Sequence, residues 1–403
     1  MHNAHIEREQ LYGAHNYDPL PVVLTHASGV WVWDEMGKRY LDMMSAYSAL
    51  SHGHAHPKLV KTLQKQAEKL SIVSRAFYTD RLGLFLEKIC DITHFDKALP
   101  MNTGAEAVET ALKAARKWAY SVKNVPENSA EIIACHGNFH GRTIAIVGMS
   151  SEPQYQSGFG PFPQGFKLIP FGNAAELERA ITANTAAFLV EPIQGEAGVI
   201  VPPAGYLKQC EEICKQHNVL FICDEIQTGL GRTGKLLAAH HDDVQPDAIV
   251  LGKALGGGLF PVSLFLTRKE IMDVFTPGDH GSTFGGNALA ASVALCAIDV
   301  LLEEKMIDNA NFIGNYFLQK LKEIHSPIIK EIRGKGLLIG LEVNQLYSAR
   351  KICLKLLSQG ILTKETHGTV VRFAPPLIVT EQQIDIAISA LKKVFAEIEA
   401  SGK

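Results

Sequence analysis

The sequence lacks several features that would place it outside ordinary soluble enzymes or binding proteins. Its 403 residues carry a formal net charge of only −3, which gives no electrostatic reason to expect binding to nucleic acid or to an anionic membrane. It contains no internal repeat, low-complexity tract or coiled-coil pattern. The seven cysteines are odd in number and irregularly spaced, which predicts reduced thiols rather than a disulfide framework.

The chain also lacks a recognisable targeting or membrane segment. Residues 1–9 are polar and acidic, unlike a secretory signal or an Arg-rich transit peptide, so we expect a cytoplasmic protein. One long stretch, residues 248–266, is free of charge except for Lys253. It also contains three consecutive glycines and Pro261, a combination that favours a buried strand, a turn and a second strand over a membrane span.

Three histidines at alternate positions resemble a metal-binding tract. His52, His54 and His56 lie in a loop that contains Gly53 and precedes Pro57, so their side chains are expected to point in different directions. Ligand number and geometry decide such sites, and we predict no metal here.

The length and apolar content of the chain are typical of a globular protein, and its length predicts two domains that share a cleft. Hydrophobic residues make up 46% of the chain and charged residues 20%. Apolar runs without alternation predict strands buried on both faces, which is typical of an α/β protein with a mainly parallel sheet. We predict an N-terminal segment, residues 1–47, that packs with the small domain, a large domain, residues 48–292, and a small domain, residues 293–403.

Two opposite charges follow two of these buried strands. The run Val219–Cys223 leads to Asp224, and the run Ala248–Leu251 leads through Gly252 to Lys253, at the sheet edge where open α/β proteins bind ligands. Apolar surroundings should lower the pKa of the lysine toward a neutral amine that can form a Schiff base. Pyridoxal phosphate requires a lysine that binds its aldehyde and a carboxylate that pairs with its ring nitrogen. The opposing interpretation is that the lysine extends out of a turn and the aspartate caps a helix.

The stretch from Gly229 to Lys235 offers a nucleotide-binding alternative. It matches a dinucleotide fingerprint and all but the last position of a P-loop. The P-loop needs Ser or Thr where Leu236 stands, and the dinucleotide motif needs a strand running directly into the glycines and an acid about 20 residues later. Residues 224–228 intervene and Asp247 comes too early, so nucleotide binding is the weaker hypothesis.

Further candidates lie at strand ends and at one helix start. Gly104 and Ala105 open a long helix whose free amides and positive dipole end could hold a phosphate. Phe139 could stack on a flat ring and Arg142 could bind a carboxylate, with core packing and a surface ion pair as the respective alternatives. The remaining candidates are charged residues near predicted strands, namely Glu191, Glu196 and Arg372.

Four motifs resemble the class III pyridoxal-phosphate aminotransferases, in the family's order and spacing from about Tyr12 to the last helix. They are Asn-Thr-Gly-Ala-Glu-Ala at 102–107, Asp-Glu-Ile-Gln at 224–227, Lys253, and Ser-Thr-Phe-Gly-Gly-Asn at 282–287. The resemblance implies the type I fold of pyridoxal-phosphate-dependent transferases, with a large domain around a mainly parallel seven-stranded sheet and a smaller α+β domain. It also implies a homodimer with active sites at the subunit interface.

The resemblance implies roles for individual residues. Lys253 would form the Schiff base with pyridoxal phosphate and shuttle a proton, and Asp224 would pair with the ring nitrogen. The other implied cofactor contacts are Gln227 with the ring hydroxyl, Phe139 stacked on the ring, the Gly104 and Ala105 amides on the phosphate, Thr283 from the partner subunit, and Glu191 and Ile226 beside them. His140 and Ala105 differ from the residues typical of the motif, without affecting this chemistry.

Within the class, residues 12–21, 45–48, 191–199 and 371–376 look most like the branch that acts on ornithine. That branch implies ping-pong transfer of the δ-amino group of L-ornithine to 2-oxoglutarate, giving glutamate and glutamate 5-semialdehyde, which cyclises to pyrroline-5-carboxylate. Tyr17 and Arg142 would hold the substrate carboxylate, and Tyr47 would line the pocket. Glu196 would pair with Arg372 in the first half-reaction and release it in the second. The alternatives are N-acetylornithine or 4-aminobutyrate as the amino donor, and a chain that binds the cofactor without turnover.

Overall fold

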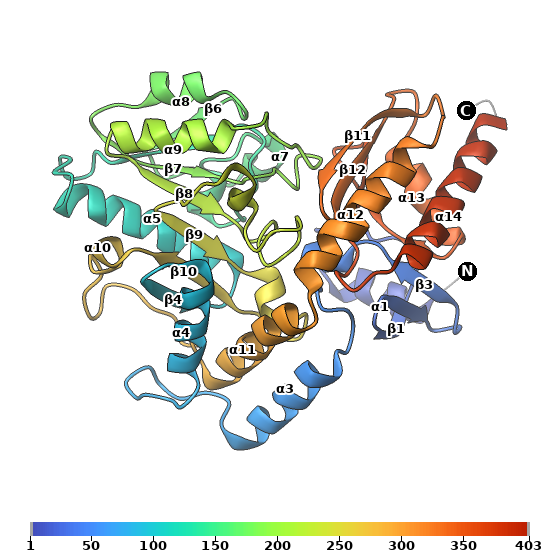
Figure 1. Ribbon diagram of the computed structural model, residues 1–403, viewed down its shortest axis with the longest axis horizontal. Helices are drawn as coiled ribbons and strands as arrows, with labels where there is room; N and C mark the ends of the chain where they lie inside the picture. Colours follow the sequence, from blue (N-terminus) through green and yellow to red (C-terminus); the bar gives the residue numbers. More distant parts are fainter. Residues whose placement is uncertain (1–2, 401–403) are drawn as a thin grey trace.

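A seven-stranded sheet forms the centre of the larger part of the computed structural model, which describes residues 3–400 (Figure 1). Five neighbouring strands are parallel, and β10 pairs antiparallel with both β9 and β4. In spatial order the strands are β4 (Lys97–Met101), β10 (Ser263–Thr267), β9 (Ala248–Leu251), β8 (Leu220–Asp224), β7 (Thr185–Val190), β5 (Glu131–Cys135) and β6 (Phe166–Ile169). The predicted α/β class with a mainly parallel sheet is therefore confirmed.

Helices cover both faces of this sheet, which explains why its strands are apolar without alternation. Leu220 and Ile222 of β8 pack in one core with α5 (Gly104–Ser121), while Phe221 and Cys223 pack on the other face with α9 (Tyr206–Gln216). The other helices here are α3 (Pro57–Lys69), α4 (Leu82–Thr93), α6 (Ile144–Val147), α7 (Pro153–Gln156), α8 (Ala174–Ala180), α10 (Lys269–Met272) and α11 (Ala288–Glu303), with the 3₁₀ helices η1 (Ala238–Asp242) and η2 (Lys253–Gly256).

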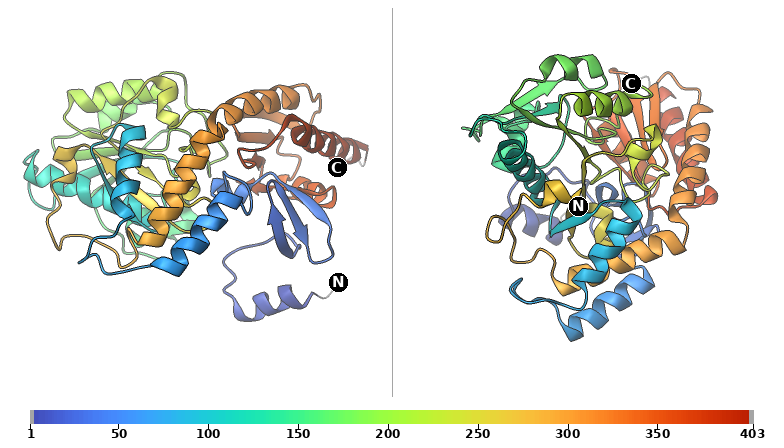
Figure 2. Two further views of the ribbon diagram at one scale, coloured as in Figure 1. Left: turned by 60° about the horizontal axis from the view of Figure 1, so that its bottom comes forward. Right: turned by 60° about the vertical axis from the view of Figure 1, so that its left-hand side comes forward.

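A smaller antiparallel sheet lies at the C-terminal end of the chain. Its spatial order is β11 (Ile329–Lys335), β12 (Leu338–Val343), β15 (Val370–Phe373) and β14 (Lys364–Thr366), accompanied by α12 (Met306–Lys322), α13 (Ala349–Ser358) and α14 (Glu381–Ala400). These elements lie beside the N-terminal strands in both orientations of the molecule (Figure 2).

The N-terminal segment joins this smaller part through a shared sheet. It contains α1 (Ala4–Tyr12), β1 (Leu24–Ser28), β2 (Trp31–Asp34), β3 (Arg39–Asp42) and α2 (Ser45–Ser48), and β3 pairs in parallel with β13 (Ile361–Leu362). The domain boundaries stay predictions, and the one between residues 292 and 293 falls inside the continuous helix α11.

The three alternating histidines bind three separate partners. His52 Nε2 lies 2.9 Å from the carbonyl oxygen of Ala297, His54 Nε2 lies 2.8 Å from a carboxylate oxygen of Asp42, and His56 contacts Glu304. Across residues 3–400, no group of His, Cys, Asp or Glu side chains has an arrangement that could hold a metal ion. Over the same range, no helix has both the length and the apolar character needed to span a membrane.

Candidate active site

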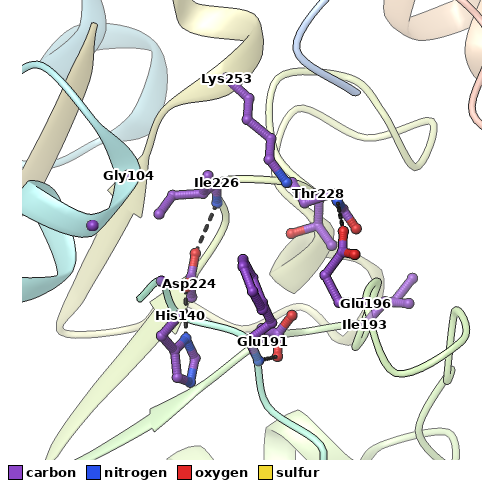
Figure 3. Close-up of a pocket in the computed structure, with 13 residues that line it drawn as sticks. Gly104, His140, Glu191, Ile193, Glu196, Asp224, Ile226, Thr228 and Lys253 are labelled. Atoms are coloured by element: carbon purple, nitrogen blue, oxygen red, sulfur yellow. Dashed lines mark hydrogen bonds and ion pairs between the residues drawn. The ribbon is translucent and has the colours of Figure 1, made fainter. Parts of the chain in front are cut away.

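An inner cavity of about 210 Å³ opens at the carboxyl edge of the large sheet (Figure 3). Asp224 reaches it from the end of β8, Lys253 from the turn after β9, and Glu191 from the end of β7. The start of α5 and the loop after β5 complete the wall. The lining residues are Gly104, Ala105, Phe139, His140, Gly141, Glu191, Ile193, Glu196, Asp224, Ile226, Gln227, Thr228 and Lys253.

The orientation of Asp224 is fixed by two hydrogen bonds (Figure 3). One carboxylate oxygen lies 2.7 Å from His140 Nδ1, and the other accepts the backbone N–H of Ile226 at 3.1 Å. Asp224 and His140 are both buried. Sequence reasoning missed this contact, because the two residues are separated by 84 positions and only the folded sheet brings them together.

Lys253 faces the same cavity with a lowered pKa, as the apolar surroundings predicted. Burial, assisted by the positive charge of Arg372, lowers its pKa to about 8, although the carboxylates of Glu196, Asp224 and Glu191 oppose the shift. A substantial fraction of the amine is therefore neutral near pH 8 and available as a nucleophile or base.

The two glutamates beside Lys253 have opposite protonation tendencies. Burial and the nearby Asp224 carboxylate raise the pKa of Glu191 well above its ordinary value, and its side chain accepts the Phe139 N–H at 3.0 Å. Burial also opposes ionisation of Glu196, but Arg372 and Lys253 lower the pKa of Glu196 to about 2. Glu196 is therefore a fixed negative charge, while Glu191 retains a proton much more readily.

The inner cavity has the groups that a phosphorylated ring cofactor needs. The amides of Gly104 and Ala105 begin the 18-residue helix α5 and find no acceptor within residues 3–400, so they are free for a phosphate. A Cβ on Gly104 would lie 3.0 Å from the Ile226 side chain, so a larger residue there would press against Ile226. Gln227 Oε1 is buried without a partner in the described chain and can serve a ligand hydroxyl.

A larger outer cleft of about 800 Å³ adjoins the inner cavity and shares Phe139, Glu196 and Lys253 with it. The predicted substrate residues Tyr17, Tyr47, Arg142 and Arg372 also line the cleft. Of the residues predicted for the site, only Thr283 lines neither cavity, and its side chain is exposed on this chain.

A partly buried ion pair forms the floor of the outer cleft. Arg372 Nη1 lies 2.6 Å from Glu196 Oε1, which also accepts a hydrogen bond from Gln227 at 3.1 Å. The Arg372 guanidinium lies 5.2 Å from the centre of the Tyr47 ring. A Cβ on Gly195 would lie only 1.5 Å from Gln227 Oε1, so this network requires glycine at that position.

Arg142 lies over an aromatic wall rather than in a surface ion pair. Its guanidinium is 4.4 Å from the centre of the Tyr155 ring, which packs edge-on against Phe139 at 5.9 Å. Neither Arg142 nor Lys364, another residue of the cleft, forms an ion pair with a carboxylate in the described part of the chain. Sequence reasoning missed Tyr155, because α7 has only four residues and gives no periodic signal.

The glycine-rich stretch does not form a nucleotide site. A Cβ on Gly234 would lie 2.9 Å from the backbone of Asn311 in α12, and one on Gly336 would lie 2.4 Å from the backbone of Thr233. The stretch is thus packed tightly against the smaller part of the molecule, and neither cavity is lined by residues 229–235.

Comparisons with known proteins agree with this geometry. The family model described as aminotransferase class-III matches residues 12–395. The chain is 57% identical over 393 residues to an ornithine aminotransferase of Brevibacillus brevis, covering 98% of each sequence. It is similar to a solved ornithine aminotransferase of Toxoplasma gondii with partial occupancy of pyridoxal phosphate, with a TM-score of 0.96, 46% identity, and coverage of 98% of this chain and 95% of that one. It is also similar to an acetylornithine aminotransferase of Elizabethkingia anophelis, with a TM-score of 0.89, 49% identity and 98% coverage of both chains.

Proposed function

The chain belongs to the class III aminotransferase family, whose members depend on pyridoxal phosphate, and we propose that it transfers the δ-amino group of L-ornithine to 2-oxoglutarate. The products are glutamate and glutamate 5-semialdehyde, which cyclises to pyrroline-5-carboxylate. When bound, the cofactor supplies a ring that accepts electrons from the carbon next to the transferred nitrogen.

The residues of the inner cavity are proposed to hold the cofactor and move the proton. Lys253 is the covalent attachment point, and its amine, with a pKa of about 8, can take and return a proton at the reacting carbon. Asp224, held by His140 and by the Ile226 N–H, is proposed to face a protonated ring nitrogen. The remaining proposed contacts are Gln227 with the ring hydroxyl, Phe139 on the ring face, the Gly104 and Ala105 amides on the phosphate, and Glu191 and Ile226 packed beside them.

The ion pair between Glu196 and Arg372 is the observation that carries the ornithine proposal. With the pair closed at 2.6 Å, the cleft floor is electrically neutral and can accept a substrate that brings an amine toward Lys253. If Glu196 turns away, Arg372 becomes free to bind the distal carboxylate of 2-oxoglutarate as a bidentate fork. One site can thus serve two differently charged substrates without remodelling.

The carboxylate of ornithine must lie at the far end of the cleft from Lys253. Arg142 and Tyr17 line that cleft, and the ammonium group of Lys364 lies 6.0 Å from the Tyr17 ring. These groups support carboxylate binding there. Tyr47, beside Arg372, supports a narrow pocket for an unsubstituted side chain.

N-acetylornithine is the second candidate donor, favoured by the likeness to the acetylornithine aminotransferase of Elizabethkingia anophelis. Its acyl group would need room near Tyr17 and Tyr47, where this chain has two phenol rings. The test compares kcat/KM for ornithine, N-acetylornithine and 4-aminobutyrate. A preference of tenfold or more for either rival, about 1.4 kcal/mol in transition-state binding, would overturn ornithine as the substrate.

We also propose a homodimer in which Thr283 reaches the phosphate in the partner subunit. Thr283 is exposed and is followed in the chain by the exposed ring of Phe284, which supports an interface at this loop. Cytoplasmic location stays a prediction.

Mixed dimers test the proposed contribution of Thr283. A dimer of one Lys253→Ala chain and one Thr283→Ala chain contains one intact site if Thr283 acts across the interface, so mixing the two should restore activity. A chain carrying both substitutions, mixed with wild type, leaves no intact site in the mixed dimer. The mixed dimers are therefore separated from the homodimers with differently tagged chains before assay, and equal activity of the two isolated mixed dimers would contradict the proposal.

A further inference from the structure

Arg232 lies in the glycine-rich stretch that the cofactor and substrate proposals leave without a role. Its side chain is fully buried, and it lines neither cavity. Burial lowers its pKa to about 9 against the opposing charge of Asp42, so the guanidinium stays positive at neutral pH. Its four hydrogen-bond acceptors in the described chain are all uncharged. A buried charge of this kind is expensive, and such groups are usually paired.

The four acceptors come from three separate segments. Nη1 donates to the carbonyl oxygens of Leu337, at 3.1 Å, and Pro375, at 2.5 Å. Nη2 donates to the hydroxyl oxygens of Ser45, at 3.4 Å, and Ser51, at 3.0 Å. The planar guanidinium therefore ties a loop of the large domain to the β11–β12 turn, to the residues after β15 and to the N-terminal segment.

The two serine hydroxyls also donate hydrogen bonds to backbone carbonyl oxygens. Ser45 Oγ donates to the carbonyl oxygen of Ala374 at 2.5 Å, and Ser51 Oγ donates to that of Ser48 at 3.4 Å. Each hydroxyl accepts from Arg232 and donates its own proton, so the arginine and the two serines form one connected network.

This network surrounds a turn with an unfavourable backbone. Ser45, Ala46, Tyr47 and Ser48 have φ values of 42°, 48°, 59° and 72°, in the left-handed region that L-residues avoid. Asp42 supports the turn from one side by accepting the N–H groups of Met44 and Ser45, each at 2.8 Å. Four such residues in a row persist only when the surrounding contacts hold them.

Two side chains of the outer cleft depend on the segments that Arg232 ties together. Tyr47 belongs to the left-handed turn, and Arg372 belongs to β15, whose following residues Ala374 and Pro375 are held by the network. On the basis of the proposed function, we infer that Arg232 is a positioning residue for substrate recognition, which holds Tyr47 and Arg372 in register without touching substrate or cofactor.

The first test replaces Arg232 by lysine, which keeps the charge but loses the planar fork. Arg232→Lys should retain the visible absorption band of bound pyridoxal phosphate, because Arg232 contacts neither Lys253 nor Asp224. KM for both ornithine and 2-oxoglutarate should rise about 10- to 100-fold with a much smaller change in kcat, since displaced positioning groups weaken productive binding. The control is Arg116→Lys, which also loses a guanidinium–carbonyl hydrogen bond, 2.8 Å to Gln164, far from the turn. Equal KM values in the two variants would overturn the inference.

A rescue experiment separates positioning from a general loss of stability. Ser48 has a φ of 72° and a buried hydroxyl without a hydrogen-bond partner of its own in the described chain, so glycine fits this position better. Ser48→Gly should lower the raised KM of Arg232→Lys by about threefold or more, because glycine removes the strain at that position. No recovery would contradict a role that acts through the turn.

A second variant decides the matter if Arg232→Lys does not fold. Ser45→Ala combined with Ser51→Ala leaves the arginine in place and removes its two hydroxyl acceptors, and KM should again rise while the absorption band persists. Unchanged KM values would overturn the inference. Single-turnover reactions with L-glutamate, followed by the change in the same absorption band, test the role of Arg232 separately from the ornithine proposal. If the wild-type protein reacts with glutamate but not with ornithine, ornithine is not the amino donor. The role of Arg232 is then tested by comparing the glutamate concentration that gives half the maximal rate in the wild type and in the variants.

Discussion

The inner cavity and the outer cleft meet at Lys253 but are built in different ways. Residues of the inner cavity all lie between positions 104 and 253 and are attached to one sheet and its helices. The outer cleft is assembled from distant segments that carry Tyr17, Tyr47, Arg142, Glu196 and Arg372. The sheet holds all the groups of the inner cavity, whereas the outer cleft combines Arg142 and Glu196 from the larger part with Tyr17, Tyr47 and Arg372 from other segments. Reaction type and substrate choice can therefore change independently in this molecule.

The strongest test of the inner cavity is removal of its amine. Lys253→Ala should reduce turnover about 1,000-fold or more, since it deletes both the nucleophile and the proton carrier. Borohydride reduction of the holoprotein followed by peptide mapping should label residue 253 in wild type and give no label in the variant. Lys364→Ala, which removes a cleft lysine instead, should keep the label. Wild-type protein with residue 253 unmodified would contradict the assignment.

A smaller effect is expected from Asp224→Asn, which keeps the shape of the side chain but not its charge. We expect kcat to fall about 100-fold or more for every amino donor, because an amide cannot stabilise a protonated ring nitrogen. A loss confined to one substrate would show that Asp224 acts in substrate choice and not in the chemistry common to all donors. Asp247→Asn is the control, since Asp247 is partly buried, accepts the Phe221 N–H and pairs with Arg268 away from the cavity.

The same difference decides how much the sequence could reveal. Lys253 and Asp224 follow uninterrupted apolar runs, so the pattern of apolar residues was enough to predict that both lie at the same edge of the sheet. Tyr17 and Tyr47 came only from family resemblance, because nothing local links them to the site. The left-handed turn at 45–48 contains no glycine, so turn rules could not detect it. Contacts such as Arg232 with Pro375 span 143 positions and depend on the packing of domains, which no local pattern encodes.

Substrate choice should respond to a single change in the outer cleft. Glu196→Gln leaves Arg372 charged and unpaired, so the cleft favours a distal carboxylate over a distal amine. The ratio of kcat/KM for glutamate to that for ornithine should rise about tenfold or more, equivalent to about 1.4 kcal/mol. Glu365→Gln is the control, because this cleft carboxylate pairs with Arg350 instead, at 3.2 Å. An unchanged ratio would show that the ion pair does not select the substrate.

The smallest expected effect tests whether the outer ion pair reaches the inner cavity. In cofactor-free protein, only the neutral amine of Lys253 can attack pyridoxal phosphate, so the attachment rate should rise with pH and level off above about 8 rather than near 10.5. Glu196 raises the pKa of Lys253 and Arg372 lowers it. Glu196→Gln should therefore move the midpoint to lower pH and Arg372→Met to higher pH, as measured from growth of the visible band after rapid mixing. Identical midpoints in the wild type and both variants would mean that the outer ion pair does not influence the charge of Lys253. The groups for chemistry and those for substrate choice would then be electrostatically separate, although the ion pair lies beside Lys253.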